Sequence, residues 1–145
     1  MSELHVLCKI ADAEYVLPAA DVLQMESFTG ATKVPGADEQ VAGLVQIRGR
    51  VVPVLDLRVV FGLPTISPTI DSRVVVMKRG DRTVGLLVDY AREVLKIPPA
   101  DFQPPPAVVT QQTEGLVKAV VQAGNRLLML IDFTKVIGEE REHAE

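Results

Sequence analysis

Three times along the chain, an apolar run rich in β-branched residues enters a glycine-containing turn and continues as a second apolar run. These units cover residues 41–63, 74–89 and 116–132. β-branched runs on both sides of a short glycine turn are typical of a β-hairpin. The pattern therefore predicts three hairpins, and the first carries Arg48-Gly49-Arg50 at its tip.

Each of the three units contains an aspartate just after an apolar strand, at Asp56, Asp89 and Asp132. The uneven spacing of these aspartates argues against a solenoid of fixed period and favours duplicated barrel halves. Their repeated place at a strand end predicts capping or turn stabilisation in preference to acid–base catalysis. The expected fold class is all-β, with short helical segments.

Pro53 lies inside the second run of the first hairpin, which indicates an edge position or a bulge. The alternation there allows Val51 to face the core, in which case Val51→Asp is expected to unfold this part of the protein.

Weaker signals complete the map of elements. Residues 4–10 alternate as a strand and residues 15–17 form a second short strand ended by Pro18, whereas residues 19–25 suit either a helical turn or a strand. Residues 133–140 can form a short helix capped by Asp132 or Thr134.

Three segments are expected to connect or follow the folded parts. The proline-containing stretch 63–69 predicts a boundary between two lobes near residue 70, and the proline cluster 98–106 predicts a stiff loop, with a polyproline-reader ligand as the alternative. Residues 139–145 form an acidic tail that is expected to be solvated.

Composition limits the function classes. The 145 residues are 48% hydrophobic but only 4% aromatic, so the core must be built from Val, Leu and Ile. A net charge of −4 without a long Lys/Arg cluster argues against nucleic-acid binding. The start lacks the pattern of a signal peptide and no apolar run reaches membrane-spanning length, so we expect a cytoplasmic protein without direct membrane insertion.

Candidate chemistry is sparse. Cys8 falls in an alternating strand and is expected to be a buried thiol, while His5 and His143 lie at opposite ends without a nucleophile or acid partner. There is no cysteine pair, no histidine pair at helical spacing, no calcium-type loop and no phosphate-binding glycine motif. We therefore expect no catalysis, no metal and no cofactor.

The order of residues 34–63 resembles the CheW family of chemotaxis coupling proteins. In that family, proline or small residues precede a turn like Gly-Val-Ile-Asn-Leu-Arg-Gly, which is followed by Val-Pro-Val-Ile-Asp-Leu-Arg. The resemblance continues through Val84-Gly-Leu-Leu-Val-Asp89, Val94-Leu95 and Leu128-Met-Leu-Ile-Asp132, so that it covers the chain from about Leu4 to Gly138.

This resemblance implies a single CheW-like domain over residues 1–140, made of two SH3-like five-stranded β-barrel lobes, with residues 139–145 as the tail. Lobe one would cover about residues 12–70, and lobe two about 71–138 plus the N-terminal strand 4–10. The implied function is a non-enzymatic adaptor between the regulatory domain of a CheA-type histidine kinase and the cytoplasmic tip of chemoreceptors. Such a protein would act in the cytoplasm at membrane-associated receptor arrays.

Site residues carry over by position. The receptor contacts of the family fall on Val22, Gln24, Arg48, Val75 and Val94, which would form an apolar groove between the lobes with one cation at its rim. A receptor helix could dock there by burying aliphatic side chains while the arginine holds a carboxylate. The kinase contacts fall on Ala19, Met25 and Phe28, whose alternative role is simply to fill the core.

Two departures from the family pattern occur near these positions. Gln24 stands where the family usually has an acidic residue, and Gln46 stands where it has Asn. Loss of a carboxylate at an interface rim mainly changes partner choice and association rate. The chain could therefore serve a divergent receptor and kinase pair, in a pathway that controls something other than flagella.

Functions of other classes remain as alternatives. A small-ligand-binding or catalytic β-barrel could use Arg48, Asp56 and Arg58 as a polar site. A peptide-binding SH3-like module is disfavoured, because polyproline grooves need aromatic walls that this chain largely lacks.

Overall fold

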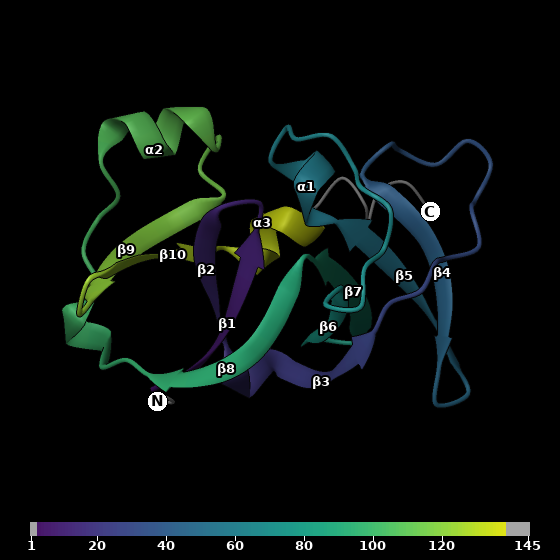
Figure 1. The fold of residues 1–145 in the computed structure, drawn as a ribbon, viewed down its shortest axis with the longest axis horizontal. Helices are drawn as coiled ribbons and strands as arrows, with labels where there is room; N and C mark the ends of the chain where they lie inside the picture. Colours follow the sequence, from purple (N-terminus) through teal and green to yellow (C-terminus); the bar gives the residue numbers. More distant parts are fainter. Residues whose placement is uncertain (1–2, 139–145) are drawn as a thin grey trace.

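The computed structural model describes residues 3–138, which form ten β-strands, three short α-helices and two 3₁₀ turns (Figure 1). The strands are β1 (Leu4–Ile10), β2 (Ala13–Pro18), β3 (Val22–Ser27), β4 (Val41–Ile47), β5 (Arg50–Asp56), β6 (Arg73–Arg79), β7 (Arg82–Val88), β8 (Tyr90–Lys96), β9 (Val117–Ala123) and β10 (Arg126–Ile131). The helices are α1 (Leu57–Val60), α2 (Ala107–Gln112) and α3 (Phe133–Ile137), and the 3₁₀ turns are η1 (Ala19–Asp21) and η2 (Pro99–Asp101). The expected all-β class and the three hairpins β4–β5, β6–β7 and β9–β10 are confirmed. The acidic tail and His143 lie outside the described residues.

The strands form two five-stranded sheets that lie side by side (Figure 1). The continuous sheet has the order β3-β6-β7-β5-β4 and is built from one stretch of chain. The split sheet has the order β8-β1-β2-β10-β9 and combines the first two strands with the last three. Each sheet contains one parallel pair, β5 with β7 and β10 with β2. The second order repeats the first when β8, β9, β10, β1 and β2 replace β3 to β7, so the sheets are two copies of one topology.

The expected lobe boundary near residue 70 does not separate the two sheets. The strand β2, which was expected in lobe one, pairs with β1 and β10 in the split sheet. The hairpin β6–β7, which was expected in lobe two, belongs to the continuous sheet through pairing with β3 and β5. Parallel and long-range pairings decide sheet membership, and the loop 63–69 is therefore an internal connection of the continuous sheet.

Isolated bridges link opposite edges of each sheet at equivalent places. Thr32, after β3, pairs with Leu44 of β4, and Gln103, after β8, pairs with Val120 of β9. Both bridges carry backbone hydrogen bonds in both directions, with N to O distances of 2.8 to 2.9 Å. The two edge strands of each sheet are thereby tied together by a single residue pair.

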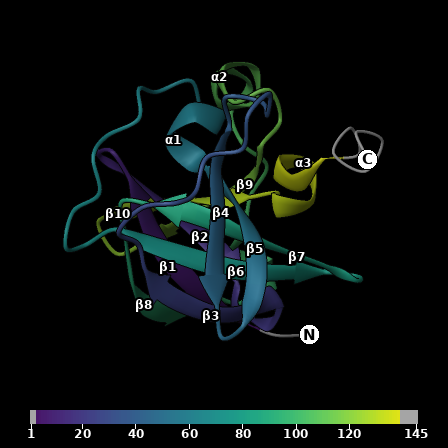
Figure 2. The same ribbon diagram turned by 90° about the vertical axis from the view of Figure 1, so that its right-hand side faces the viewer.

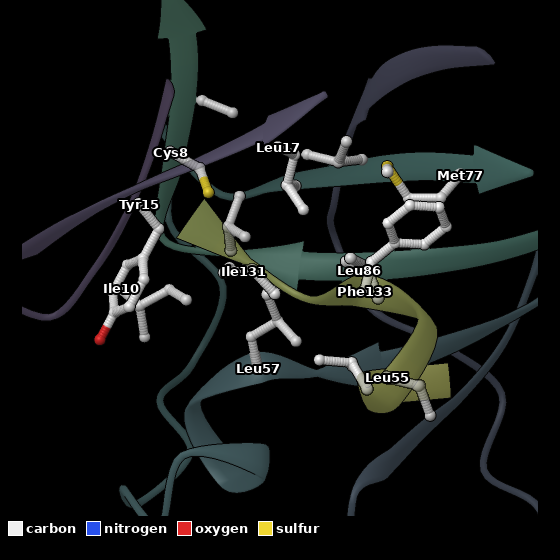
Figure 3. Packing of buried hydrophobic residues seen from close by; sticks show 14 of the residues in the cluster. Cys8, Ile10, Tyr15, Leu17, Leu55, Leu57, Met77, Leu86, Ile131 and Phe133 are labelled. Carbon is white, nitrogen blue, oxygen red and sulfur yellow. The ribbon is translucent and has the colours of Figure 1, made fainter. Parts of the chain in front are cut away.

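The largest buried cluster lies between the two sheets. It brings Cys8 and Leu17 of the split sheet against Met77 and Leu86 of the continuous sheet, and side chains from both sheets point toward one another in Figure 3. Smaller clusters surround Leu128 in the split sheet and Val54 in the continuous sheet. Burial raises the pKa of Cys8 to about 12, as expected for an inert core thiol.

The side chains of β5 that face the core are not the ones that the sequence interpretation assigned to it. The Val51 side chain is 67% exposed, whereas Val52 and Val54 are 2% and 0% exposed, so a core-facing Val51 is wrong. Pro53 lies in an interior strand between β4 and β7, not at an edge. It faces Leu44, whose backbone groups bond Thr32 on the far side of β4, so the missing N–H interrupts no bond between β4 and β5.

Two of the three repeated aspartates cap helices. Asp56 accepts a hydrogen bond from the backbone N–H of Arg58 at the start of α1, and Asp132 accepts one from Lys135 at the start of α3. Burial opposes ionisation of Asp132, but hydrogen bonds from the Thr134 hydroxyl and the Lys135 amide outweigh it and lower the pKa of the carboxyl. The capping interpretation is confirmed at these two sites.

The third aspartate, Asp89, ties the two sheets together. Its carboxylate accepts hydrogen bonds from the Arg58 Nε at 2.9 and 3.1 Å and from the Arg58 Nη2 at 2.8 Å. It also accepts the backbone N–H of Ala11, in the β1–β2 turn of the split sheet, at 2.7 Å. The hydrogen bonds from Arg58 to Asp89 raise the pKa of the guanidinium above its usual value, so Arg58 stays charged at any accessible pH.

A second bidentate ion pair joins parallel strands within the split sheet. The Arg126 guanidinium on β10 donates to both carboxylate oxygens of Glu14 on β2, at 3.1 and 2.8 Å. This hydrogen bonding lowers the pKa of Glu14 below its ordinary value of 4.5. Because the folded state holds the charged carboxylate, the pair stabilises the protein above the unfolded pKa, and this contribution disappears as the pH falls through the folded pKa.

Glu14→Gln is therefore expected to reduce the loss of stability that the protein suffers below about pH 4.5. The free energy of unfolding, measured with urea from neutral to acid pH, should fall less steeply in the variant than in the wild-type protein. Arg126→Gln should likewise reduce the decrease in the free energy of unfolding at acid pH. If the free energy of unfolding decreases equally at acid pH in all three proteins, Glu14 does not couple folding to pH.

Candidate partner-binding site

Strand β3 is an edge strand whose two faces differ. Val22, Gln24 and Glu26 are half-buried, whereas Leu23 and Met25 are exposed, at 48% and 36%. The pairing of β3 with β6 shifts by one residue between Val22 and Gln24, since Val22 pairs with Met77 and Gln24 with the adjacent Val76. Val22 and the expected kinase residue Met25 therefore lie on the face of the cluster between the sheets, whereas Gln24 and Glu26 share the other face.

The tip of the β4–β5 hairpin presents Arg48 to solvent, with 77% of its side chain exposed. Arg48 and Gly49 both adopt left-handed backbone conformations, with φ of 51° and 80°. Two consecutive positive φ values are typical of the type I′ turn that connects two-residue hairpins. Arg48 is thus held by backbone geometry, and its guanidinium is free of the core. Figure 2 shows this hairpin toward the viewer, with its tip beside β3.

A short polar chain links the two elements. The Gln24 Nε2 donates a hydrogen bond of 2.7 Å to the Glu26 Oε2, and the same oxygen lies 3.9 Å from the Arg48 Nε. Gln24 and Glu26 share a face because they lie two residues apart on β3. The arginine at the hairpin tip is therefore paired with a carboxylate that the sequence interpretation did not include.

A groove of about 520 Å³ opens beside this chain, between the edge strands β3 and β4. Its walls are Glu26 and Ser27 of β3, the turn 28–32 and residues 44–47 of β4. The groove opens beside the backbone bridge from Thr32 to Leu44, which links the two edges. Gln46, two residues beyond Leu44, directs its backbone groups to the same side as the bridge, toward the groove.

The structure brings some expected receptor residues together and removes others. Val22, Gln24 and Arg48 lie on β3 and the adjacent hairpin tip. Val75 is fully buried at 0% exposure in the cluster between the sheets, so a direct surface contact there is wrong. Val94 is 52% exposed, but it lies on β8 of the split sheet.

The expected kinase residues differ in whether a partner can reach them. Met25 is exposed on β3, and Ala19 is half-buried in η1. Phe28 is only 7% exposed and packs with Val54 and Val74, so it is part of the core of the continuous sheet and no surface contact. Leu23, which the sequence interpretation missed, supplies the exposed apolar surface next to Met25. The alternation of exposed and half-buried positions along β3 is the signal that could have found Leu23.

The structure does not bring Arg48, Asp56 and Arg58 together as the alternative polar site requires. Arg48 lies at the tip of the β4–β5 hairpin and Asp56 at the far end of β5, which places them about 20 Å apart at the usual rise of a strand. Asp56 bonds the Arg58 backbone and the Thr65 hydroxyl, while the Arg58 guanidinium bonds Asp89. These groups are engaged in structural contacts.

Residues 3–138 contain neither a candidate metal site nor a candidate membrane-spanning helix. Within residues 3–138, no three His, Cys, Asp or Glu side chains gather as a metal site. No helix in the same part of the chain has both the length and the apolar character needed to span a membrane.

Comparison with known proteins identifies relatives along the whole chain. The model of the CheW-like domain matches residues 4–141. A chemotaxis protein CheW from Bacillus subtilis is 30% identical over 138 residues, which cover 95% of this chain and 88% of that protein. A CheW from Thermotoga maritima is 31% identical over 140 residues, which cover 96% and 91%. The crystal structure of the scaffolding protein TtCheW from Thermoanaerobacter tengcongensis superposes with a TM-score of 0.86 and 27% identity, covering 97% of both chains. The chain therefore belongs to the CheW-like family.

Proposed function

We propose that this protein is a non-enzymatic adaptor that couples chemoreceptors to a CheA-type histidine kinase. The observation that carries the proposal is the match of 97% of the chain to a scaffolding protein, at a TM-score of 0.86. Relatives named chemotaxis protein CheW support the chemosensory setting. The protein would act as one CheW-like domain in the cytoplasm, at membrane-associated receptor arrays.

The half-buried and exposed positions of β3 suit an adaptor that must contact two partners. The half-buried residues Val22 and Gln24, together with Arg48, would receive the cytoplasmic tip of the receptor, and Val94 would extend this contact onto the split sheet. The exposed residues Leu23 and Met25, with Ala19 nearby in sequence, would receive the regulatory domain of the kinase. Exposed aliphatic side chains supply burial on docking, whereas an exposed arginine sets register and charge preference.

The first experiment is co-sedimentation of the purified protein with a CheA-type kinase and a receptor cytoplasmic fragment from the same organism. Recovery of the kinase in the receptor pellet only when this protein is present would support the coupling role. If neither partner binds the protein, the adaptor function is wrong although the fold remains. Gln24 favours a divergent receptor and kinase pair, so partners from a non-flagellar pathway of the same organism should be included.

Arg48→Glu is expected to weaken receptor binding by about tenfold or more while leaving the fold intact. The reversed charge would repel the carboxylate that the arginine holds, and it would also face Glu26, which lies 3.9 Å from the wild-type guanidinium. Binding to a receptor fragment should be titrated at fixed ionic strength, with a circular dichroism melt as the check on folding. Arg48→Lys is the matched control, since it keeps the charge and the same left-handed backbone. Equal affinity of the Arg48→Glu and wild-type proteins would remove Arg48 from the site.

A further inference from the structure

Glu26 occupies an unusual place in the candidate site. Among the described residues that line the groove between β3 and β4, it is the one charged side chain. Its Oε2 accepts the hydrogen bond from the Gln24 amide at 2.7 Å and also faces Arg48. The amide thereby fixes the direction of a carboxylate that stands at the edge of a groove, next to an exposed cation.

The pair of Glu26 and Arg48 contributes little to holding the fold together. The two charged groups are 3.9 Å apart, beyond hydrogen-bond distance, and their side chains are 36% and 77% exposed. Pairs of this kind are screened by solvent and are worth little. By contrast, the pairs of Arg58 with Asp89 and of Arg126 with Glu14 are bidentate, with closest distances of 2.8 Å. Both Glu26 and Arg48 thus retain hydrogen-bonding capacity that another molecule can use.

We infer that Glu26 and Arg48 form a two-charge recognition site, in which Glu26 is the anionic half and Gln24 is the residue that positions it. The partner that fits is a helix that presents a cation and an anion one turn apart. Such side chains lie about 5–6 Å from each other, close enough for the cation to reach Glu26 while the anion reaches Arg48. This inference rests on the proposed function and specifies the chemistry of the receptor helix at that site.

The position of the carboxylate explains how this chain can carry Gln24 where an acidic residue was expected. Residues 24 and 26 lie on the same face of β3, about 6.6 Å apart along the strand. The chain therefore supplies a carboxylate on the same face, two residues later, and uses position 24 as its neutral hydrogen-bond donor. A glutamate at position 24 would place a second carboxylate against Glu26, and like charges in contact are destabilising.

The test compares receptor binding of the wild-type protein with Glu26→Gln, Arg48→Gln and the variant that carries both changes. Dissociation constants for the receptor fragment would be measured by titration at two salt concentrations. Each single change is expected to weaken binding by about tenfold, and the double variant should be no weaker than the worse single variant, because both changes disrupt one site. The salt dependence should also be smaller in Glu26→Gln than in the wild-type protein.

Lys96→Gln is the matched control. Lys96 faces Glu3 at 4.0 Å, with exposures of 76% and 40%, so this loose pair nearly repeats the geometry of Arg48 and Glu26 on the split sheet. Its loss should leave the dissociation constant unchanged. Gln24→Ala tests the positioning role: it should weaken binding less than Glu26→Gln and keep the wild-type salt dependence, since both charges remain.

The outcomes separate this inference from the proposed function. If the wild-type protein binds and Glu26→Gln binds equally well, the two-charge site is wrong and the adaptor role stands. Fully additive losses in the double variant would show that Glu26 and Arg48 act independently, which also overturns the inference. If the wild-type protein does not bind the receptor fragment, the proposed function fails and this inference fails with it.

Discussion

Val54→Asp is expected to unfold the protein. Val54 is 0% exposed and packs with Phe28, Val74 and Val76 in the core of the continuous sheet. A carboxylate there would be buried without a cation, at a loss of at least about 4 kcal/mol in the free energy of unfolding. Since small domains have roughly 5–15 kcal/mol in total, the variant should have little or no folded state at room temperature. Circular dichroism and size-exclusion chromatography would measure the loss.

Val51→Asp is the control for this experiment, because the two valines lie three residues apart on one strand. Val51 is 67% exposed, so the new carboxylate stays in water, and we expect a folded, soluble protein with a melting temperature near that of the wild type. An unfolded Val51→Asp together with a folded Val54→Asp would show that the phase of β5 is the reverse of the one described.

Asp89→Ala is expected to lower the free energy of unfolding by about 2 kcal/mol. The substitution leaves the Arg58 guanidinium without its bidentate acceptor and the Ala11 amide without its 2.7 Å partner, and the Arg58 and Asp89 side chains are only 18% and 21% exposed. The estimate lies below that of a fully buried pair because solvent still reaches both groups. Urea unfolding at neutral pH would measure it.

Two comparison variants make this result interpretable. Asp89→Asn keeps the size and one acceptor oxygen, so it should lose less stability than Asp89→Ala. Glu3→Ala removes a carboxylate from the loose 4.0 Å pair with Lys96 and should change stability by a few tenths of a kcal/mol. A stability of Asp89→Ala equal to that of Glu3→Ala would mean that the contact between the sheets contributes nothing measurable.

The hairpins could be predicted from sequence because their signals are local. The turn at Arg48 and Gly49 lies between two apolar runs, and the structure pairs those runs as β4 and β5. Sheet membership could not be predicted in the same way. The pairings of β7 with β5 and of β2 with β10 are parallel and join segments that are far apart in the chain. No short turn in the sequence predicts such pairings. The boundary near residue 70 failed for this reason.

The strand phase failed for a different reason. Val51 and Val52 are identical residues in a run that is apolar on both faces, so alternation carries no information about which one is buried. The candidate site shows a similar limit of the sequence. Arg48 was assigned to the receptor contacts through the resemblance to the CheW family, whereas Glu26 was missed because its role depends on contacts with Gln24 and Arg48 that only the fold creates. Position 26 could have been placed on the face of Gln24 by counting two residues along β3.

The division of strands between the sheets also sets an order of events during synthesis. Strands β3 to β7 leave the ribosome in succession and contain every strand of their own sheet. The hairpin β1–β2 emerges before them, but its neighbours β8 and β10 are made only afterwards. The β1–β2 hairpin therefore keeps unpaired strand edges until β8 and β10 have been synthesised. Slowing translation after β7 should lengthen the time during which these edges are exposed.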